Sequence, residues 1–419
     1  MNSAAYLSKI LITSTLTSAL FLAGCGSDNN DSPSNQISPS LITKTENYAP
    51  QQTESTTSLS QKITYKMPAI AGGQTTATAV VMIPKGTVPT GGWPMVVWAH
   101  GTTGVADQCA PSNLKSENGE FNLGGALPIA QALVNRGYAV IAPDYEGLGS
   151  SGIHPFLNSK SESESIISAV KAVKQQYSNQ VSNDWAVVGH SQGGHAAMAT
   201  AERADDAGLN FKGVVAYAPA SNLGTILLGG YAQVKSVLGQ PAGVPTAKAV
   251  LPDLQAFASL ISAGIMQYQP TFTYKTGFTS QRAIDIAAKS ESECYPQVAA
   301  KFKADIADFY NDSANATKLY PGLDENFIQI PAAAIFLVDS TIGQKPVAKP
   351  IVVVQGELDN TVPAAITRLL ESQVRASSKT NSNISFNYPA TETHGTVVLD
   401  ALNPNGQLAA FLKTNLPSK

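Results

Sequence analysis

Charged residues are scarce in this chain of 419 residues, making up 14% of it, and the formal net charge is only −3. The lysines and arginines are scattered rather than clustered, so the sequence lacks the basic field that nucleic-acid binding needs, and no nucleic-acid partner is expected. It also lacks an H-E-x-x-H motif and paired C-x-x-C motifs, so no metal site is predicted. The G-x-G-x-x-G run from Gly147 to Gly152 is followed by "IHPF" and not by a helix, which argues against a dinucleotide site and leaves no cofactor predicted.

The N-terminus has the features of an export signal. Lys9 precedes the apolar run "ILITSTLTSALFLAG", which is too short and too rich in Ser and Thr for a membrane span. The run ends in "LAGC", which resembles a bacterial lipobox, so residues 1–24 are predicted to be a lipoprotein signal peptide and Cys25 to be lipidated. The alternative is an ordinary signal peptide with an incidental cysteine. Gly26, where some lipoproteins have Asp, favours the outer membrane of a cell that has one.

The segment that follows Cys25 is polar. Residues 25–62 are rich in Ser, Thr, Asn and Gln and poor in residues that could build a core. They are therefore predicted to form a flexible tether between a lipid anchor and a folded domain. On this interpretation the protein is an exported lipoprotein, membrane-anchored or released, with the membrane as one partner.

Cysteine is rare, with three residues in the chain. Because Cys25 is assigned to lipidation, Cys109 and Cys294 remain as a pair in an exported, oxidising setting, and one disulfide is predicted. The alternative is two unpaired buried thiols.

From Ile63 onward, short apolar runs alternate with helical patterns. Strands are expected at "ATAVVMIP", "PMVVWAH", "YAVIAPDYEG", "DWAVVGHS", "FKGVVAYAPAS" and "KPIVVVQGELD". This alternation predicts an α/β fold, with a mainly parallel sheet and helices on both faces. Between residues 222 and 345 apolar segments keep helical spacing but the matching strands disappear, which predicts a helical cap inserted between two parts of the core, residues 63–221 and 346–419.

A serine lies in a sharp turn of this pattern. The run "GHSQG" places Ser191 in a G-x-S-x-G motif between a predicted strand and a predicted helix, where a serine is lifted to the carboxyl edge of the sheet. A hydroxyl attacks an acyl carbon only when a base takes its proton and an acid holds that base. Asp359 follows a predicted strand and His394 lies in the loop after the last predicted strand, "NISFNYPA". The chain order is therefore Ser, Asp, His, and these three are the predicted catalytic triad.

The acid and the base of the triad each have a rival interpretation. Asp359 could merely cap the helix that follows it, and Asp339 is a weaker acid candidate because no comparable strand leads into it. His195 is the competing base, since it lies one helical turn after Ser191, but we expect it to pack beside the site. The other three histidines are less suitable: two lie in loops and one is in the variable position of the motif, and they are His100, His154 and His190.

Acyl transfer also needs donors for an oxyanion, and backbone N–H groups usually supply them. One donor is expected from Gln192, the residue after the nucleophile, and the other from Thr102 in the loop "HGTTG", with Thr103 as the alternative. The alternative is that this loop is a Gly-rich connector without a catalytic role.

Together these residues resemble the α/β-hydrolase superfamily over about residues 63–416. More narrowly, "WAHGTTGVADQCAPS", "GYAVIAPDYEGLGSSGIHPFL" and "GHSQGGHAA" look like the secretory lipase family and its bacterial relatives, whose fungal members have a smaller residue in place of Gln192. The resemblance implies a serine hydrolase of acylglycerols or smaller carboxylic esters, without a cofactor and with a helical cap. It also implies that a Cys109–Cys294 bridge would tie the cap to the core. Two competing functions are a serine peptidase on the same fold and a non-catalytic, lipid-binding surface lipoprotein.

Overall fold

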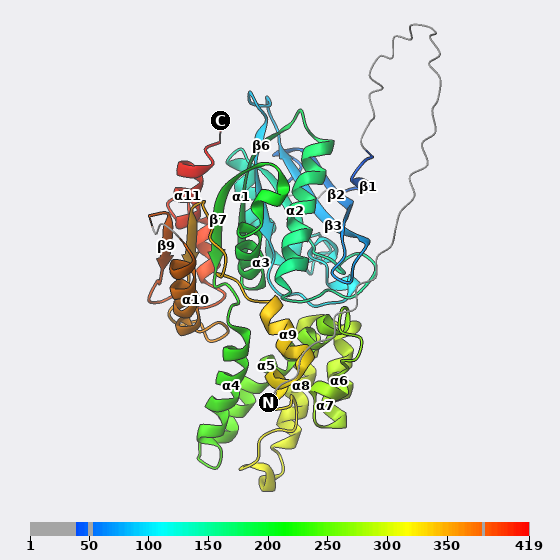
Figure 1. Ribbon diagram of the computed structural model, residues 1–419, viewed down its shortest axis with the longest axis vertical. Coiled ribbons are helices and arrows are strands. Elements are labelled where there is room, and N and C mark those ends of the chain that lie inside the picture. The colour runs from blue at the N-terminus through cyan, green and yellow to red at the C-terminus, as the bar shows by residue number, and fades with distance from the viewer. Residues whose placement is uncertain (1–38, 49–52, 379–381, 419) are drawn as a thin grey trace, which may run out of the picture. The chain divides into compact units, whose positions relative to one another are not determined.

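The computed structural model describes residues 39–48, 53–378 and 382–418, and in it nine strands form one sheet in the order β1-β2-β3-β5-β4-β6-β7-β8-β9 (Figure 1). Strands β4 to β9 pair in parallel with one another, whereas β1 pairs with β2, β2 with β3, and β3 with β5 in antiparallel fashion. The mainly parallel sheet predicted from the sequence is therefore confirmed. The strands are β1 (Ile42–Asn47), β2 (Thr57–Pro68), β3 (Gln74–Pro84), β4 (Trp93–Ala99), β5 (Ala139–Pro143), β6 (Val181–His190), β7 (Asn210–Tyr217), β8 (Ile351–Val354) and β9 (Ile384–Asn387).

Helices cover both faces of the sheet. Successive side chains of a strand point to opposite faces, and in the central strands both sets are apolar, so each face must be covered. In β6, Trp185 and Val187 belong to the apolar cluster shared with α2, α3 and α10, whereas Ala186 and Val188 belong to the cluster shared with α1 and α11. The five helices are α1 (Leu127–Asn135), α2 (Ser159–Gln176), α3 (Gln192–Ala201), α10 (Ala364–Ser377) and α11 (Gln407–Asn415).

The edge of the sheet corrects the predicted tether. Strand β1 and the start of β2 lie within residues 25–62, so the prediction of a flexible tether is wrong for these strands. The physical reason is that β1, "ITKTEN", exposes every side chain after Ile42 and is held to β2 by backbone pairing, so its composition is that of a linker. The predicted signal peptide, residues 1–24, and Cys25 lie outside the described residues.

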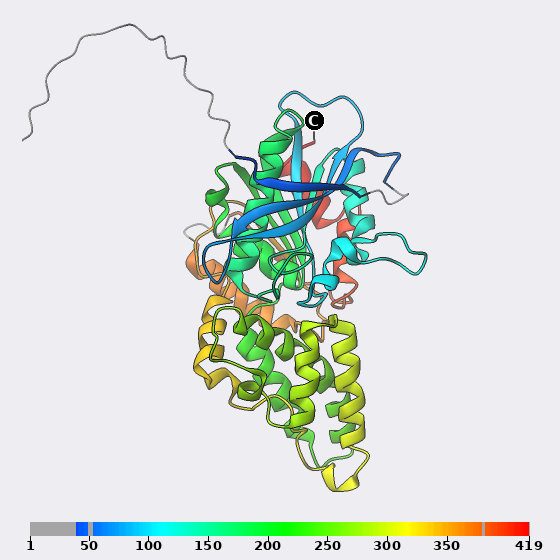
Figure 2. The ribbon, with the colours of Figure 1, turned by 90° about the vertical axis from the view of Figure 1, so that its right-hand side faces the viewer.

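Between β7 and β8 the described chain is helical, and these helices lie together beyond one end of the sheet (Figure 2). They are α4 (Leu223–Val237), α5 (Gly243–Met266), α6 (Tyr274–Gly277), α7 (Gln281–Ala287), α8 (Tyr295–Phe309) and α9 (Pro331–Asp339). They share an apolar cluster that also includes a few core residues, among them Val105, Ala220 and Val362, and we call it the cap cluster. Helix α5 is long and apolar enough to cross a membrane by length and composition, but 72% of its most apolar window is buried, so it serves as the central helix of the cap.

Both connections between cap and core are fixed by side chains. At the start of the cap, Asn222 and Gln373 of α10 exchange amide hydrogen bonds of 2.9 and 3.3 Å. At its end, the Ser340 carbonyl accepts a hydrogen bond from His195, and Glu202, which follows α3, accepts from the backbone N–H groups of residues 343–345. Helix α3 therefore binds the chain that leaves the cap at two points.

Candidate active site

Ser191 lies at the junction of β6 and α3 with a strained backbone. Its φ of 58° and ψ of −119° are unusual for a residue with a side chain and cost about 1–3 kcal/mol. The turn is held by a hydrogen bond from the Ser191 N–H to the Tyr217 carbonyl and by two that the Ser191 carbonyl accepts, from the N–H groups of His195 and Ala220. Gly193 is required beside it, because a Cβ there would lie 1.9 Å from the Ala99 carbonyl oxygen.

Ser191, His394 and Asp359 meet in one chain of hydrogen bonds. His394 Nε2 lies 2.9 Å from Ser191 Oγ, and His394 Nδ1 lies 2.8 Å from Asp359 Oδ2. Because a carboxylate accepts, Nδ1 carries the proton and Nε2 is free to accept the Ser191 hydroxyl proton. The structure thus brings together the three residues of the predicted triad.

Asp359 is fixed by further donors. Its Oδ1 accepts from the backbone N–H groups of Thr361 and Val362, and its Oδ2 also accepts from Gln355 Nε2. Burial alone would raise the pKa of Asp359, but the hydrogen bond and charge of His394, with these donors, bring the pKa below its usual value. The carboxylate therefore stays ionised and oriented toward His394.

His190, the variable residue of the motif, supports His394 from the other side. Its Nε2–H donates to the His394 carbonyl over 2.8 Å, and the two rings are 4.7 Å apart. Burial, with the nearby His394, lowers the pKa of His190 to about 4, so this ring is neutral near neutral pH. The sequence pattern gave no sign of this role, because the contact joins the end of β6 to a loop 204 residues later.

The segments that carry the predicted oxyanion donors lie beside Ser191. Gln192 is the first residue of α3, so its backbone N–H has no intrahelical acceptor. The loop that carries Thr102 passes close by, since a Cβ on Gly101 would lie 3.7 Å from Ser191 Cβ. The next residue, Thr103, accepts a hydrogen bond on its carbonyl from the Tyr295 N–H of α8, over 2.9 Å.

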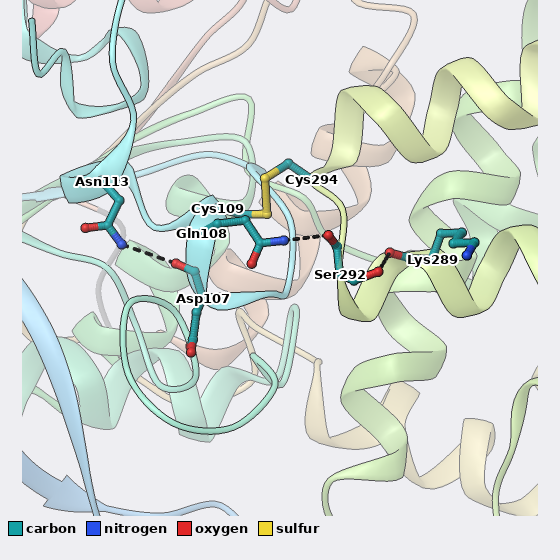
Figure 3. The surroundings of a disulfide bond; sticks show 7 residues. All are labelled: Asp107, Gln108, Cys109, Asn113, Lys289, Ser292 and Cys294. Carbon is teal, nitrogen blue, oxygen red and sulfur yellow. Dashed lines mark hydrogen bonds between the residues drawn. A yellow bond between two sulfur atoms is a disulfide. The ribbon is translucent and has the colours of Figure 1, made fainter. Parts of the chain in front are cut away.

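A disulfide joins this loop region to the cap. Cys109 lies in a short 3-10 turn, Asp107–Cys109, and Cys294 is the residue before α8, with the two Cα atoms 5.4 Å apart. The pairing predicted from the sequence is therefore present, and it ties the cap to the core. Beside it the Gln108 side chain donates to the Ser292 carbonyl (Figure 3).

Comparison with known proteins shows the family of this chain. The family described as "Serine aminopeptidase, S33" matches residues 123–385, which is more than half of the chain. The chain belongs to this hydrolase family. No curated protein sequence matches it. The family and the fold together identify this chain, a member of the S33 family, as a serine hydrolase of the α/β-hydrolase superfamily.

Solved structures resemble this S33 family member in fold. Lipase A from Candida antarctica in its closed state is 18% identical with a TM-score of 0.61, and the alignment covers 90% of this chain and 83% of the lipase. A rice cell wall degrading esterase, LipA, from Xanthomonas oryzae is also 18% identical with a TM-score of 0.61, over 90% of this chain and 99% of the esterase. At this identity the likeness shows the fold. The narrower resemblance to the secretory lipase family stays a prediction.

The rival residues lie elsewhere in this S33 family member. His195 contacts Glu162 and Ser340, while Asp339 ends α9 and accepts a hydrogen bond from Ser159 on its carbonyl. His100 and His154 are buried, and each contacts a carbonyl on the loop after β5. Within the described residues, no group of three or more His, Cys, Asp or Glu could hold a metal ion.

Proposed function

We propose that this protein is a carboxylic ester hydrolase, a lipase or esterase, that works through an acyl-enzyme on Ser191. The observation that carries the proposal is the hydrogen-bonded chain Ser191–His394–Asp359 at a strained strand-to-helix turn. Nucleophile, base and acid are within hydrogen-bonding distance in the order that the chemistry requires.

The reaction proceeds in two balanced steps. Ser191 Oγ attacks the ester carbonyl carbon as His394 Nε2 takes its proton, and the N–H groups of Gln192 and Thr102 stabilise the negative carbonyl oxygen. The C–O bond to the alcohol then breaks, His394 returns the proton to the leaving alcohol, and the acyl group remains on Ser191. In the second step His394 takes a proton from water, the hydroxide attacks the acyl carbon, and the acid leaves as Ser191 recovers its proton.

An apolar acyl group fits the surroundings of the triad. The cap cluster extends to Val105 next to the Thr102 loop, to Ala220 against the Ser191 carbonyl, and to Val362 next to the Asp359 loop. Apolar side chains from cap and core therefore meet around the three loops of the site, and burial of an acyl chain there is favourable by about 0.8 kcal/mol for each CH₂. The structural neighbours named as a lipase and an esterase also support an ester substrate.

The family description makes a peptidase the second candidate, because it names an aminopeptidase. Hydrolysis of p-nitrophenyl esters from acetate to palmitate, measured beside aminoacyl p-nitroanilides, separates the two. We expect turnover of the esters and loss of at least about 10³-fold in kcat for Ser191→Ala. Preferred turnover of the anilides would make the protein a peptidase, and full ester turnover by Ser191→Ala would remove Ser191 as nucleophile.

A fluorophosphonate probe tests the non-catalytic alternative. An activated serine reacts with the probe, so the wild type is expected to gain one adduct on Ser191, and Ser191→Ala is the matched control. An unlabelled wild type would favour a binding protein that has the triad geometry without its reactivity.

We also propose that the protein is an exported lipoprotein acylated at Cys25. The "LAGC" motif supports this, and β1 begins at Ile42, so the tether that remains is shorter than residues 25–62. Incorporation of labelled palmitate in a bacterial host, lost in Cys25→Ser, is the expected result. Secretion of an unlabelled wild type would contradict it.

A further inference from the structure

A buried network of polar side chains surrounds the first turn of α3, which follows Ser191. Glu162, His195 and His154 are fully buried and Gln192 is 1% exposed. Glu162 Oε2 lies 2.6 Å from His195 Nδ1, and Glu162 Oε1 lies 2.8 Å from Gln192 Nε2. One carboxylate therefore binds two side chains of the first turn of α3.

The hydrogen bonds fix the charge of each ring. His195 faces the Glu162 carboxylate through Nδ1 and the Ser340 carbonyl through Nε2, both acceptors, so it is an imidazolium. Burial alone would lower the pKa of His195, but the charge and hydrogen bond of Glu162 raise it above its usual value. His154 differs, because its Nε2 accepts from Gln192 and its Nδ1–H donates to the Glu146 carbonyl, so it is neutral. The charge of Glu162 is thus compensated by His195.

The position of this pair bears on catalysis. Gln192 and His195 are the first and fourth residues of α3, and the His195 N–H bonds to the Ser191 carbonyl. The N-terminus of a helix carries a partial positive charge that favours an anion. An uncompensated carboxylate next to this turn would oppose the oxyanion that forms beside Ser191, and it would do so most strongly in a buried setting of low dielectric.

We propose that His195 is a positioning residue of the ester hydrolysis, an inference that rests on the proposed function. It neutralises Glu162 and, through Glu162, holds Gln192 so that the α3 N-terminus stays electropositive toward the oxyanion. Its other ring nitrogen binds Ser340, at the end of the cap, to the same helix.

Isosteric variants separate charge from packing. In Glu162→Gln the new amide can donate to a neutral His195 while its oxygen still accepts from Gln192, so the contacts persist without charge. In His195→Asn a donor to Glu162 persists but the positive charge is lost. In the double variant the two amides can pair, and no charge remains to compensate.

The test measures kcat and KM on p-nitrophenyl butyrate, with urea unfolding as a separate measure of stability. We expect kcat to fall at least about tenfold in His195→Asn with KM within about twofold, and to stay within about threefold of wild type in Glu162→Gln and in the double variant. A purely structural role would instead reduce stability in His195→Asn without rescue of kcat by Glu162→Gln. Unchanged kcat in His195→Asn, or no rescue in the double variant, overturns the proposal.

Two further measurements keep the result decisive. Glu202→Gln is the matched control, because Glu202 also binds the end of the cap but from the opposite end of α3, and its kcat is expected to be unchanged. If His195→Asn does not fold, kcat of Glu162→Gln is compared directly with kcat of the double variant. We expect the two values to be equal. A tenfold lower kcat in the double variant would contradict the proposal. Ser191→Ala, measured beside them, distinguishes the two failures: full activity there would refute the proposed function, whereas inactivity there with wild-type kcat in His195→Asn would refute this inference alone.

Discussion

Removing the Cys109–Cys294 disulfide is expected to lower thermal stability measurably. The bond spans 185 residues of sequence, and a cross-link of that length lowers the entropy of the unfolded chain by an amount worth ~5 kcal/mol. Unfolding of the compact unit Ser40–Lys419 should have an entropy of ~0.8 kcal/mol per kelvin, from about 2.1 cal/mol/K for each residue. The double variant Cys109→Ala/Cys294→Ala should therefore melt ~6 °C below the wild type.

The same variant should also lose activity, because the bond lies next to the oxyanion loop. The Tyr295 N–H still binds the Thr103 carbonyl and Gln108 still binds Ser292, so the cap is loosened and not released. Complete loss of one oxyanion donor costs about 10²–10³-fold in kcat, so partial loss of its orientation should cost roughly tenfold.

Calorimetry at several scan rates and kcat on p-nitrophenyl butyrate measure the two effects. Reductant should reproduce both in the wild type, with a mass increase of two hydrogens, and should not affect the double variant further, which makes that variant the control. An unchanged melting temperature would refute the entropic argument, and an unchanged kcat would refute the coupling of the bond to the oxyanion loop.

Two further predictions concern the charge state of buried groups. Asp359→Asn should lower kcat by about 10³–10⁴-fold with little change in KM, because an amide no longer selects the Nδ1–H tautomer of His394; a loss below tenfold in ester kinetics would contradict this. Burial lowers the pKa of His154 and His190 to about 4, so below pH ~6.5 the unfolded chain takes up protons before the folded one does. Folding stability should therefore fall between pH ~6.5 and ~4 by up to about 3 kcal/mol for each ring, and His154→Gln should flatten this decline in urea midpoints; an unaltered slope would show that His154 does not titrate there.

The sequence led to the triad because each member stands next to a recognisable strand. Ser191 lies between a β-branched run and a small-residue helix, and Asp359 and His394 each follow a predicted strand, so the parallel order of the sheet places all three at one edge. The edge strand β1 could not be recognised in the same way, since its side chains are exposed and its order comes from backbone pairing.

The supporting groups were not predictable from spacing. His195 meets Glu162 across 33 residues and Ser340 across 145, and His190 meets the His394 carbonyl across 204. Such contacts depend on how loops return to the sheet, which neither hydrophobic periodicity nor a short motif encodes. The sequence identified His195 as a competing base expected to pack beside the site, whereas the structure shows it hydrogen-bonded to the Glu162 side chain and the Ser340 carbonyl.

The cap has more attachments than a hinged lid needs. Its start is held by Asn222, its middle by the disulfide at Cys294, and its end by His195 of α3 and by Glu202, which follows that helix. A rigid swing of the whole cap would have to break a covalent bond, the buried hydrogen bond between His195 and Ser340, and several half-buried or exposed hydrogen bonds. Leaving the buried partner unpaired costs about 1–3 kcal/mol. These attachments predict that substrate enters by movement of side chains and local segments of the cap, while the helix that begins after Ser191 also binds the end of the cap. Changes in the cap interior should accordingly alter which acyl chains bind, and changes in α3 should alter the rate of the chemical step.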